Sequence, residues 1–183
     1  EELKAESYRK GSMLKNEVFS FQVAYTCREK IRGMLKKINV KVESCLAPWI
    51  TIREVGLVPS QLPCYPDHDE NILRSAPGLY PDILMPLENN NVTLFPGQWR
   101  SIWITIDPCS QVDAGKYEVG IIFESLNGEE LARETFEIDI IGVELPRQKL
   151  KFTEWFHTDC LATWYNDKVF SEEHWLRISQ YIN

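Results

Sequence analysis

A chain of 183 residues is long enough for one domain and a remainder, because single domains cluster around about 100 to 150 residues. Hydrophobic residues make up 44% of the chain and charged residues 26%, and no apolar run approaches the ~20 residues of a membrane helix, which excludes a transmembrane protein. The formal net charge of -7 leaves only a short basic stretch at residues 28–37, so nucleic acid is not expected as a partner.

The five cysteines are widely spaced, and no CxxC pair occurs among them. This pattern disfavours a zinc ribbon or a redox motif, and the sequence predicts neither a metal site nor a cofactor. We expect each thiol to pack as a small, buried or half-buried apolar group in a reducing environment, which favours a cytoplasmic location. A chain that begins at Glu1 is also compatible with a removed signal sequence.

Three segments in the first third of the chain predict strands. EVFSFQVAYT (17–26) and INVKVES (38–44) alternate apolar and polar residues with the period of a half-buried strand. WITIREVGLV (49–58) is a third candidate, in which Gly56 suggests a bulge. The side chains expected to face the core are Phe19, Phe21, Val23, Tyr25, Ile38, Val40 and Val42.

Residues 59–91 lack clear periodicity and hold six of the ten prolines. Proline cannot donate to a central ladder, so we expect an extended surface connection here. Such a connection could cover the edge of a sheet or could bind a ligand.

Regular strands resume in QWRSIWITID (98–107), where isoleucines alternate with Trp99 and Trp103. Because both faces carry large apolar groups, we expect this strand to be buried on both sides. The next segment, 114–146, predicts a hairpin with a type I′ turn at Asn127–Gly128, and Phe136, Ile138 and Ile140 facing inward. Residues 1–146 are therefore predicted to form a mainly β domain, an antiparallel, immunoglobulin-like sandwich.

The pattern changes after Pro146. LKFTEWF (150–156) predicts a short strand, an aromatic loop follows, and Ser171 is placed to cap a helix on which Trp175, Ile178 and Ile182 recur at helical spacing. Strand, loop and helix form the first unit of an α/β fold, and one such unit has no independent core. We therefore interpret 147–183 as the start of a truncated second domain, and the chain as a fragment of a longer protein.

Four segments occur in an order that resembles glycoside hydrolase family 123 and its wider relatives. They are KNEVFSFQVAY (15–25), LYPDILMPL (79–87), DAGKYEVGI (113–121) and ELPRQKLKFTEWFHTDCLATWYNDKVFSEEHW (144–175). The resemblance implies a β-sandwich followed by a (β/α)8-type barrel. It also implies an exo-acting β-N-acetylgalactosaminidase in which the 2-acetamido group of the substrate attacks the anomeric carbon, supported by an adjacent Asp-Glu pair in the barrel.

Asp69-Glu70 lies in the proline-rich connection before the predicted barrel, so the catalytic role is not carried over to it, and no catalytic residue is assigned in this chain. Barrels place their sites at the carboxyl ends of strands, which makes His157 and Asp159 candidates for binding a sugar hydroxyl or orienting a catalytic group. Trp164 and Tyr165 are candidates for stacking on a sugar ring. Alternatively, His157 and Asp159 form structural hydrogen bonds, and the side chains of Trp164 and Tyr165 pack on the sandwich. For His174, on the predicted helix, we expect a structural or solvated role.

Three functions follow. The parent protein could be a retaining glycoside hydrolase whose barrel is the partner of this segment and whose substrate is a carbohydrate, with this chain alone inactive. The segment could instead be a carbohydrate-binding module, as six tryptophans and seven tyrosines suggest, although Trp99 and Trp103 alternate like core residues. It could also be a purely structural sandwich with an exposed apolar patch. We favour the first for the parent protein and the third for this segment.

Overall fold

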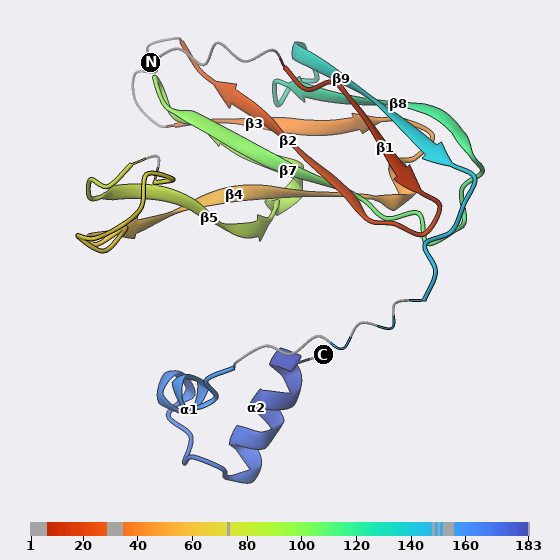
Figure 1. Ribbon diagram of the computed structural model, residues 1–183. Helices are drawn as coiled ribbons and strands as arrows, with labels where there is room; N and C mark the ends of the chain where they lie inside the picture. Colours follow the sequence, from red (N-terminus) through yellow and green to blue (C-terminus); the bar gives the residue numbers. More distant parts are fainter. Residues whose placement is uncertain are drawn as a thin grey trace. The chain divides into compact units, whose positions relative to one another are not determined.

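The computed structural model describes residues 7–28, 35–72, 74–147, 149, 151 and 156–182 (Figure 1). The chain divides into two compact units, Glu1–Leu145 and Pro146–Asn183, which are described separately. Among the described residues, no helix combines the length and the apolar character that a membrane crossing requires.

The first unit is a sandwich of two sheets, as the strand periods predict (Figure 1). The five-stranded sheet has the order β1-β9-β8-β3-β6, and the four-stranded sheet has the order β2-β7-β4-β5. The strands are β1 (Lys10–Leu14), β2 (Phe19–Thr26), β3 (Lys36–Glu43), β4 (Ile50–Ser60), β5 (Gly78–Pro86), β6 (Asn91–Leu94), β7 (Trp99–Ile106), β8 (Gly115–Glu124) and β9 (Glu130–Ile141). Short 3-10 turns lie at Ala47–Trp49 (η1) and Glu88–Asn90 (η2).

The prediction of a purely antiparallel sandwich is wrong at one edge. Strand β1, which has no clear alternation in the sequence, pairs in parallel with β9, from Lys10 opposite Glu137 to Leu14 opposite Ile141. All other strand pairs are antiparallel among the described residues. The parallel pair is possible because β1 and β9 are far apart in the chain and need no tight turn between them.

The alternating segments place their apolar side chains as predicted. Val23 and Tyr25 of β2, Ile38 and Val40 of β3, and every second residue of β9 from Phe136 to Ile140 belong to one buried cluster, which Phe19, Phe21 and Val42 border. On β7, Ile102, Ile104 and Ile106 are each 0% exposed. The core therefore lies between the two sheets.

Strand β7 is not buried on both sides, contrary to the sequence-based expectation. Trp99 and Trp103 point away from the isoleucine face, and Trp99 is 68% exposed while Trp103 is half-buried. Alternation alone does not reveal whether a second layer covers the outer face of a strand, and the described residues of this unit supply none.

The proline-rich segment is not a structureless connection. Residues 78–86 form β5, which pairs with β4 on one side only and includes Pro81 and Pro86. Proline is compatible with this position because the outer edge of an edge strand needs no ladder hydrogen bonds. The register shifts between Val55 and Leu57, which confirms the bulge expected at Gly56.

The β8–β9 hairpin is confirmed, but its turn is not type I′. Gly128 has φ 84°, whereas Asn127 is not among the residues with positive φ. The amide of Gly128 donates to the carbonyl of Ser125 at 2.9 Å, and the amide of Ser125 donates to that of Glu129 at 2.7 Å. A type I turn followed by a left-handed glycine fits this pattern and demands only one residue with positive φ.

The second unit consists of two helices in its described part, α1 (Asp159–Tyr165) and α2 (Glu172–Ile182). Residues 159–165 were predicted as an aromatic loop and are helical instead. The expected strand at 150–156 falls mostly on residues 150 and 152–155, which lie outside the described part of the chain. The described helices do not by themselves identify the start of a barrel.

The expectation that the cysteines are buried or half-buried holds for only two of them. Cys27 is buried and Cys64 is intermediate, whereas Cys45, Cys109 and Cys160 are exposed. All five lie in the described part of the chain, and none forms a disulfide.

Neighbouring residues of β9 provide a test of the core. Ile140 is 1% exposed and Ile141 is 43% exposed. We expect Ile140→Ala to lower the free energy of unfolding by about 2–5 kcal/mol, because it leaves a cavity between the sheets. Ile141→Ala, the matched control, should cost less than about 1 kcal/mol. Urea unfolding monitored by tryptophan fluorescence measures both, and equal costs would contradict the assignment of the two faces.

Candidate functional site

His174 joins the two helices of the second unit. Its side chain is fully buried, its Nε2 lies 2.7 Å from the carbonyl of Thr158, and its Nδ1 accepts a hydrogen bond from the amide of Phe170 at 2.9 Å. This pattern requires the proton on Nε2. Of the two roles left open by the sequence, structural or solvated, the structure supports the structural one.

The helix cap predicted at Ser171 is confirmed. Its Oγ accepts from the amide of His174 at 3.3 Å, and Glu172 and Glu173 occupy the first turn of α2. The Glu173 carboxylate accepts hydrogen bonds from its own backbone amide and from the Ser171 hydroxyl, and these lower its pKa. A negative charge here suits the helix dipole.

A second polar contact between the helices involves Tyr165. Its hydroxyl lies 2.9 Å from that of Tyr181, and the Arg177 guanidinium lies 4.5 Å from the centre of its ring. The hydrogen bond with Tyr165 raises the pKa of the Tyr181 phenol. Arg177 Nε is also 3.7 Å from Asp167 Oδ2. Tyr165 therefore already has partners within its own unit.

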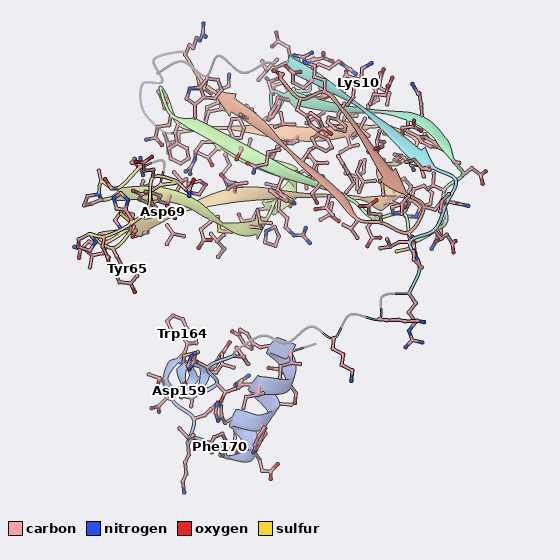
Figure 2. The ribbon with its side chains drawn as sticks, in the orientation of Figure 1. Lys10, Tyr65, Asp69, Asp159, Trp164 and Phe170 are labelled. Atoms are coloured by element: carbon pink, nitrogen blue, oxygen red, sulfur yellow. The ribbon has the colours of Figure 1, made fainter. Side chains whose placement is uncertain are left out.

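The four predicted site residues all lie on α1 or just before it. Asp159 occupies the first turn of α1 and Trp164 its last, and Figure 2 shows both side chains. Trp164 is 81% exposed and has no ring contact among the described residues. His157 and Asp159 are exposed and, within the described part, do not hydrogen-bond to each other. The geometry thus brings these residues together on one short segment without forming a catalytic arrangement.

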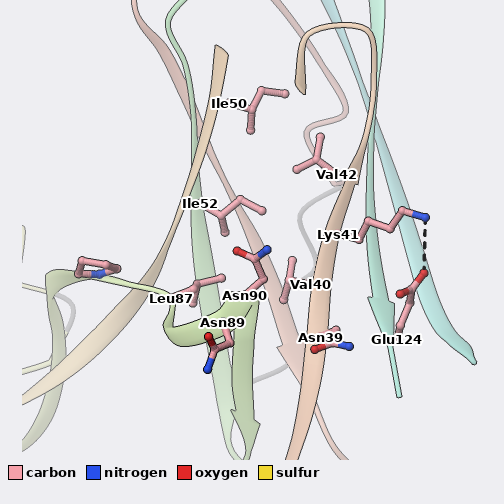
Figure 3. Close-up of a pocket in the computed structure, with 11 residues that line it drawn as sticks. Asn39, Val40, Lys41, Val42, Ile50, Ile52, Leu87, Asn89, Asn90 and Glu124 are labelled. Atoms are coloured by element: carbon pink, nitrogen blue, oxygen red, sulfur yellow. Dashed lines mark ion pairs between the residues drawn. The ribbon is translucent and has the colours of Figure 1, made fainter. Parts of the chain in front are cut away.

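A cavity of about 640 Å³ opens at one edge of the sandwich, between β3 and β4 (Figure 3). Its apolar part comes from Val40, Val42, Ile50 and Ile52, together with Leu87, and its polar part comes mainly from Asn39, Asn89 and Asn90. Lys41 and Glu124 also line it and form an ion pair with 3.9 Å between Nζ and Oε1. The cavity exists because β6 pairs only with Lys36–Asn39 of β3, and the rest of that edge is uncovered.

A second cavity, of about 660 Å³, lies within the loop between β4 and β5 and is lined by residues 62–69 and Ile72. Figure 2 marks Tyr65 and Asp69 in this loop. Asp69 Oδ1 accepts from the amide of Asn71 at 2.9 Å, as in an Asx-turn. This hydrogen bond gives the Asp69 carboxylate a local structural role.

Neither cavity carries an evident catalytic constellation. Among the described residues, no group of three or more His, Cys, Asp or Glu side chains could hold a metal ion. The single acidic residue lining the edge cavity, Glu124, is paired with Lys41.

The outer face of the four-stranded sheet is a surface that sequence reasoning missed. Trp99, Ser101, Trp103 and Thr105 follow one another along the outward side of β7, beside Gln22 of β2 and Arg53 of β4. The alternation in QWRSIWITID carries this signal, but a period of two is the same for an exposed outer face and for a face buried under a second layer.

Comparison with known proteins adds one fold likeness. No protein-family model and no curated protein matches the chain. A solved structure of a family 123 glycoside hydrolase from Clostridium perfringens, described in a study of glycolipid glycan hydrolysis, is similar with a TM-score of 0.71 and 12% identity. That likeness covers 91% of this chain and 30% of the hydrolase. A PapD-like domain of human CEP192 is similar with a TM-score of 0.35 and 11% identity, covering 75% of this chain and 84% of that one.

The likeness to the Clostridium perfringens hydrolase is one of fold, because the identity is only 12%. It agrees with the resemblance found in the sequence at this coarser level. The chain spans less than a third of that hydrolase's length.

The contacts of His174 predict its effect on the second unit. We expect His174→Ala to weaken the packing of α1 on α2 by roughly 1–3 kcal/mol, because the Thr158 carbonyl and the Phe170 amide lose their buried partner. Amide hydrogen exchange across α2 should become at least about fivefold faster. Leu176→Ala, an exposed position on the same helix, is the control. Equal exchange in the His174 variant and the parent chain would show that this histidine does not hold the helices together.

Proposed function

We propose that this chain is the sandwich and the first part of the barrel of a glycoside hydrolase related to family 123, and that the catalytic carboxyl groups belong to the part of the barrel outside these 183 residues. The observation that carries the proposal is the fold likeness to the Clostridium perfringens enzyme, which spans 91% of this chain but only 30% of that one. The ordered sequence segments at 15–25, 79–87, 113–121 and 144–175 support the same relationship independently of the fold.

The composition of the described surface agrees with a scaffold role. Several ionisable groups on the five-stranded sheet form ion pairs, such as Lys116 with Glu137 and Arg133 with Glu43 and Glu130. Arg133 lowers the pKa of the Glu43 and Glu130 carboxyls by hydrogen bonding. A carboxyl that acts as a general acid needs a raised pKa, whereas the pKa of each of these two carboxyls is lowered.

The proposed reaction is hydrolysis of a terminal β-N-acetylgalactosaminide. In the resembling family the 2-acetamido oxygen of the substrate attacks the anomeric carbon while the glycosidic bond breaks and the leaving oxygen takes a proton. Water then opens the cyclic intermediate, with retention of configuration. A barrel domain would supply the carboxyl pair that orients the acetamido group and transfers the proton.

Within this proposal, His157 and Asp159 would contribute to the barrel's site from the segment that precedes and begins α1. Both side chains are exposed, and a sugar hydroxyl could accept from the imidazole and donate to the carboxylate. Trp164, with its exposed indole, would provide a stacking surface for a sugar ring. Tyr165 is a weaker candidate because its hydroxyl and ring already contact Tyr181 and Arg177.

The first experiment compares a version of the protein extended through its natural C-terminus with the 183-residue chain. Both are assayed against a panel of 4-nitrophenyl glycosides that includes the N-acetyl-β-galactosaminide. We expect the longer protein to release nitrophenol and the shorter chain to release none, because the carboxyl pair lies outside it. Activity of the short chain would contradict the scaffold role. If the longer protein hydrolyses no glycoside of the panel, the hydrolase assignment is wrong.

Substitutions in an active longer protein test the contribution of the second unit. His157→Ala and Asp159→Asn should each lower kcat/KM by about 2- to 13-fold, since a lost hydrogen bond costs about 0.5–1.5 kcal/mol. His68→Ala and Asp69→Asn, in the loop between β4 and β5, are matched controls with the same chemistry at exposed positions. Unchanged kinetics in the His157 and Asp159 variants would assign them structural or solvent-facing roles.

A further inference from the structure

The two outer faces of the sandwich differ in charge. The face of the five-stranded sheet carries a network of ion pairs that includes Lys10 and Lys116 with Glu137, and Glu43 and Glu130 with Arg133. On the outer face formed by β2, β7 and the first half of β4, Arg53 is the sole ionisable residue among those described. We call this second surface the Trp99–Trp103 face.

The register of the strands fixes the layout of this face. Trp103 lies between Gln22 on β2 and Arg53 on β4, because each is its direct partner across the sheet. Trp99 lies four residues earlier on the same strand, about 13 Å away at the usual rise per residue. Two indoles thus sit along one line, with Ser101 between them.

The groups around the indoles are hydroxyls and an amide. Ser101 Oγ donates to Gln22 Oε1 at 3.0 Å, and the hydroxyls of Ser20 and Thr105 lie 3.2 Å apart. The Ser101 bond uses the carbonyl of Gln22 and leaves its two amide N–H donors for a ligand. Each hydroxyl also retains acceptor capacity.

We propose that the Trp99–Trp103 face binds a neutral oligosaccharide or polysaccharide chain. The apolar C–H face of a sugar ring can pack on an indole, while its hydroxyls exchange hydrogen bonds with Gln22, Ser101 and Arg53. The separation of the two indoles exceeds the width of one ring, so the ligand has several sugar units. The near absence of charge matches a neutral glycan, in contrast to the ion-paired face of the other sheet.

A protein partner is the other class of occupant, and the composition of the face favours it less. The buried centre of a protein interface is mainly apolar, whereas the outward residues of β2 and β7 between the two indoles are polar or small, with Gln22, Ala24 and Ser101 among them. This inference does not depend on the proposed hydrolase function, because it concerns residues of the sandwich alone.

The test is affinity electrophoresis of the 183-residue chain in gels that contain a neutral polysaccharide, either a β-glucan, a galactomannan or a xylan. A gel with polygalacturonate serves as the charged comparison. We expect retardation by at least one neutral polysaccharide and none by polygalacturonate. Trp99→Ala and Trp103→Ala should weaken this binding by about 5- to 30-fold, which corresponds to about 1–2 kcal/mol.

Tyr65→Ala is the matched control, because Tyr65 is an aromatic residue with 82% exposure in the loop between β4 and β5. Circular dichroism confirms that each variant is folded. Since Trp99 is largely exposed, its variant should keep the parent stability even if Trp103→Ala loses some. The proposal is overturned if no neutral polysaccharide retards the folded parent chain, or if Trp99→Ala and Trp103→Ala bind as well as Tyr65→Ala.

A second measurement separates a glycan from a protein occupant. Iodide quenching compares the accessible tryptophan fluorescence of Trp99→Ala with that of the parent, in the short chain and in the extended protein. If Trp99 contributes quenchable fluorescence in both, the face is available to a glycan. If its contribution disappears in the extended protein, the rest of that protein covers the face, and the glycan proposal is wrong even if the hydrolase assay succeeds.

Discussion

The sandwich depends on the packing of one row of isoleucines between its two sheets. Ile102, Ile104 and Ile106 are fully buried and belong to the same cluster as Val119 of β8 and Ile138 of β9. Each such side chain stabilises the fold by about 1.5–3 kcal/mol when it leaves water. Because side chains alternate along a strand, burying these three residues also forces Trp99, Ser101 and Trp103 to the outside. The core and the outer face are therefore two consequences of one register.

This coupling explains which parts of the fold the sequence could predict. Strands β2, β3 and β9 alternate cleanly, and a period of two is a local signal that needs no knowledge of the partner strand. Strand β1 has no such alternation, and its place is set by parallel pairing with β9, more than 120 residues later. Strand β5 was hidden by its prolines, which are acceptable only because β4 is its single neighbour. Edge positions of this kind depend on the whole sheet order.

The candidate site was predictable only as a stretch of chain. The residue types at 157–165 indicated polar and aromatic chemistry, but the sequence could not show that residues 159–165 are helical or that Tyr165 contacts Tyr181 and Arg177. His174 was ambiguous for the same reason, since its burial depends on the turn that brings Phe170 and Thr158 to its two nitrogens. Strand β7 is a different case, because its alternation is evident in the sequence but large apolar side chains on its second face do not establish that this face is buried. An indole on an outer face is informative because removing it from water needs a partner.

The two units hold their structure by different means, and this affects where function can reside. The sandwich has a continuous apolar core, so its outer surface can carry residues chosen for binding without loss of the fold. In the described part of the second unit the buried residues are Leu161, Ala162, His174 and Ile178. Because so few apolar residues are buried, the hydrogen bonds of His174 and Tyr165 contribute a large share of the stability of the helix pair. A substitution on α1 can therefore disturb both the helix pair and any ligand it contacts, whereas an outward residue of β7 can be changed with little effect on the core. Functional effects are easier to separate from structural ones on the sandwich than on the helices.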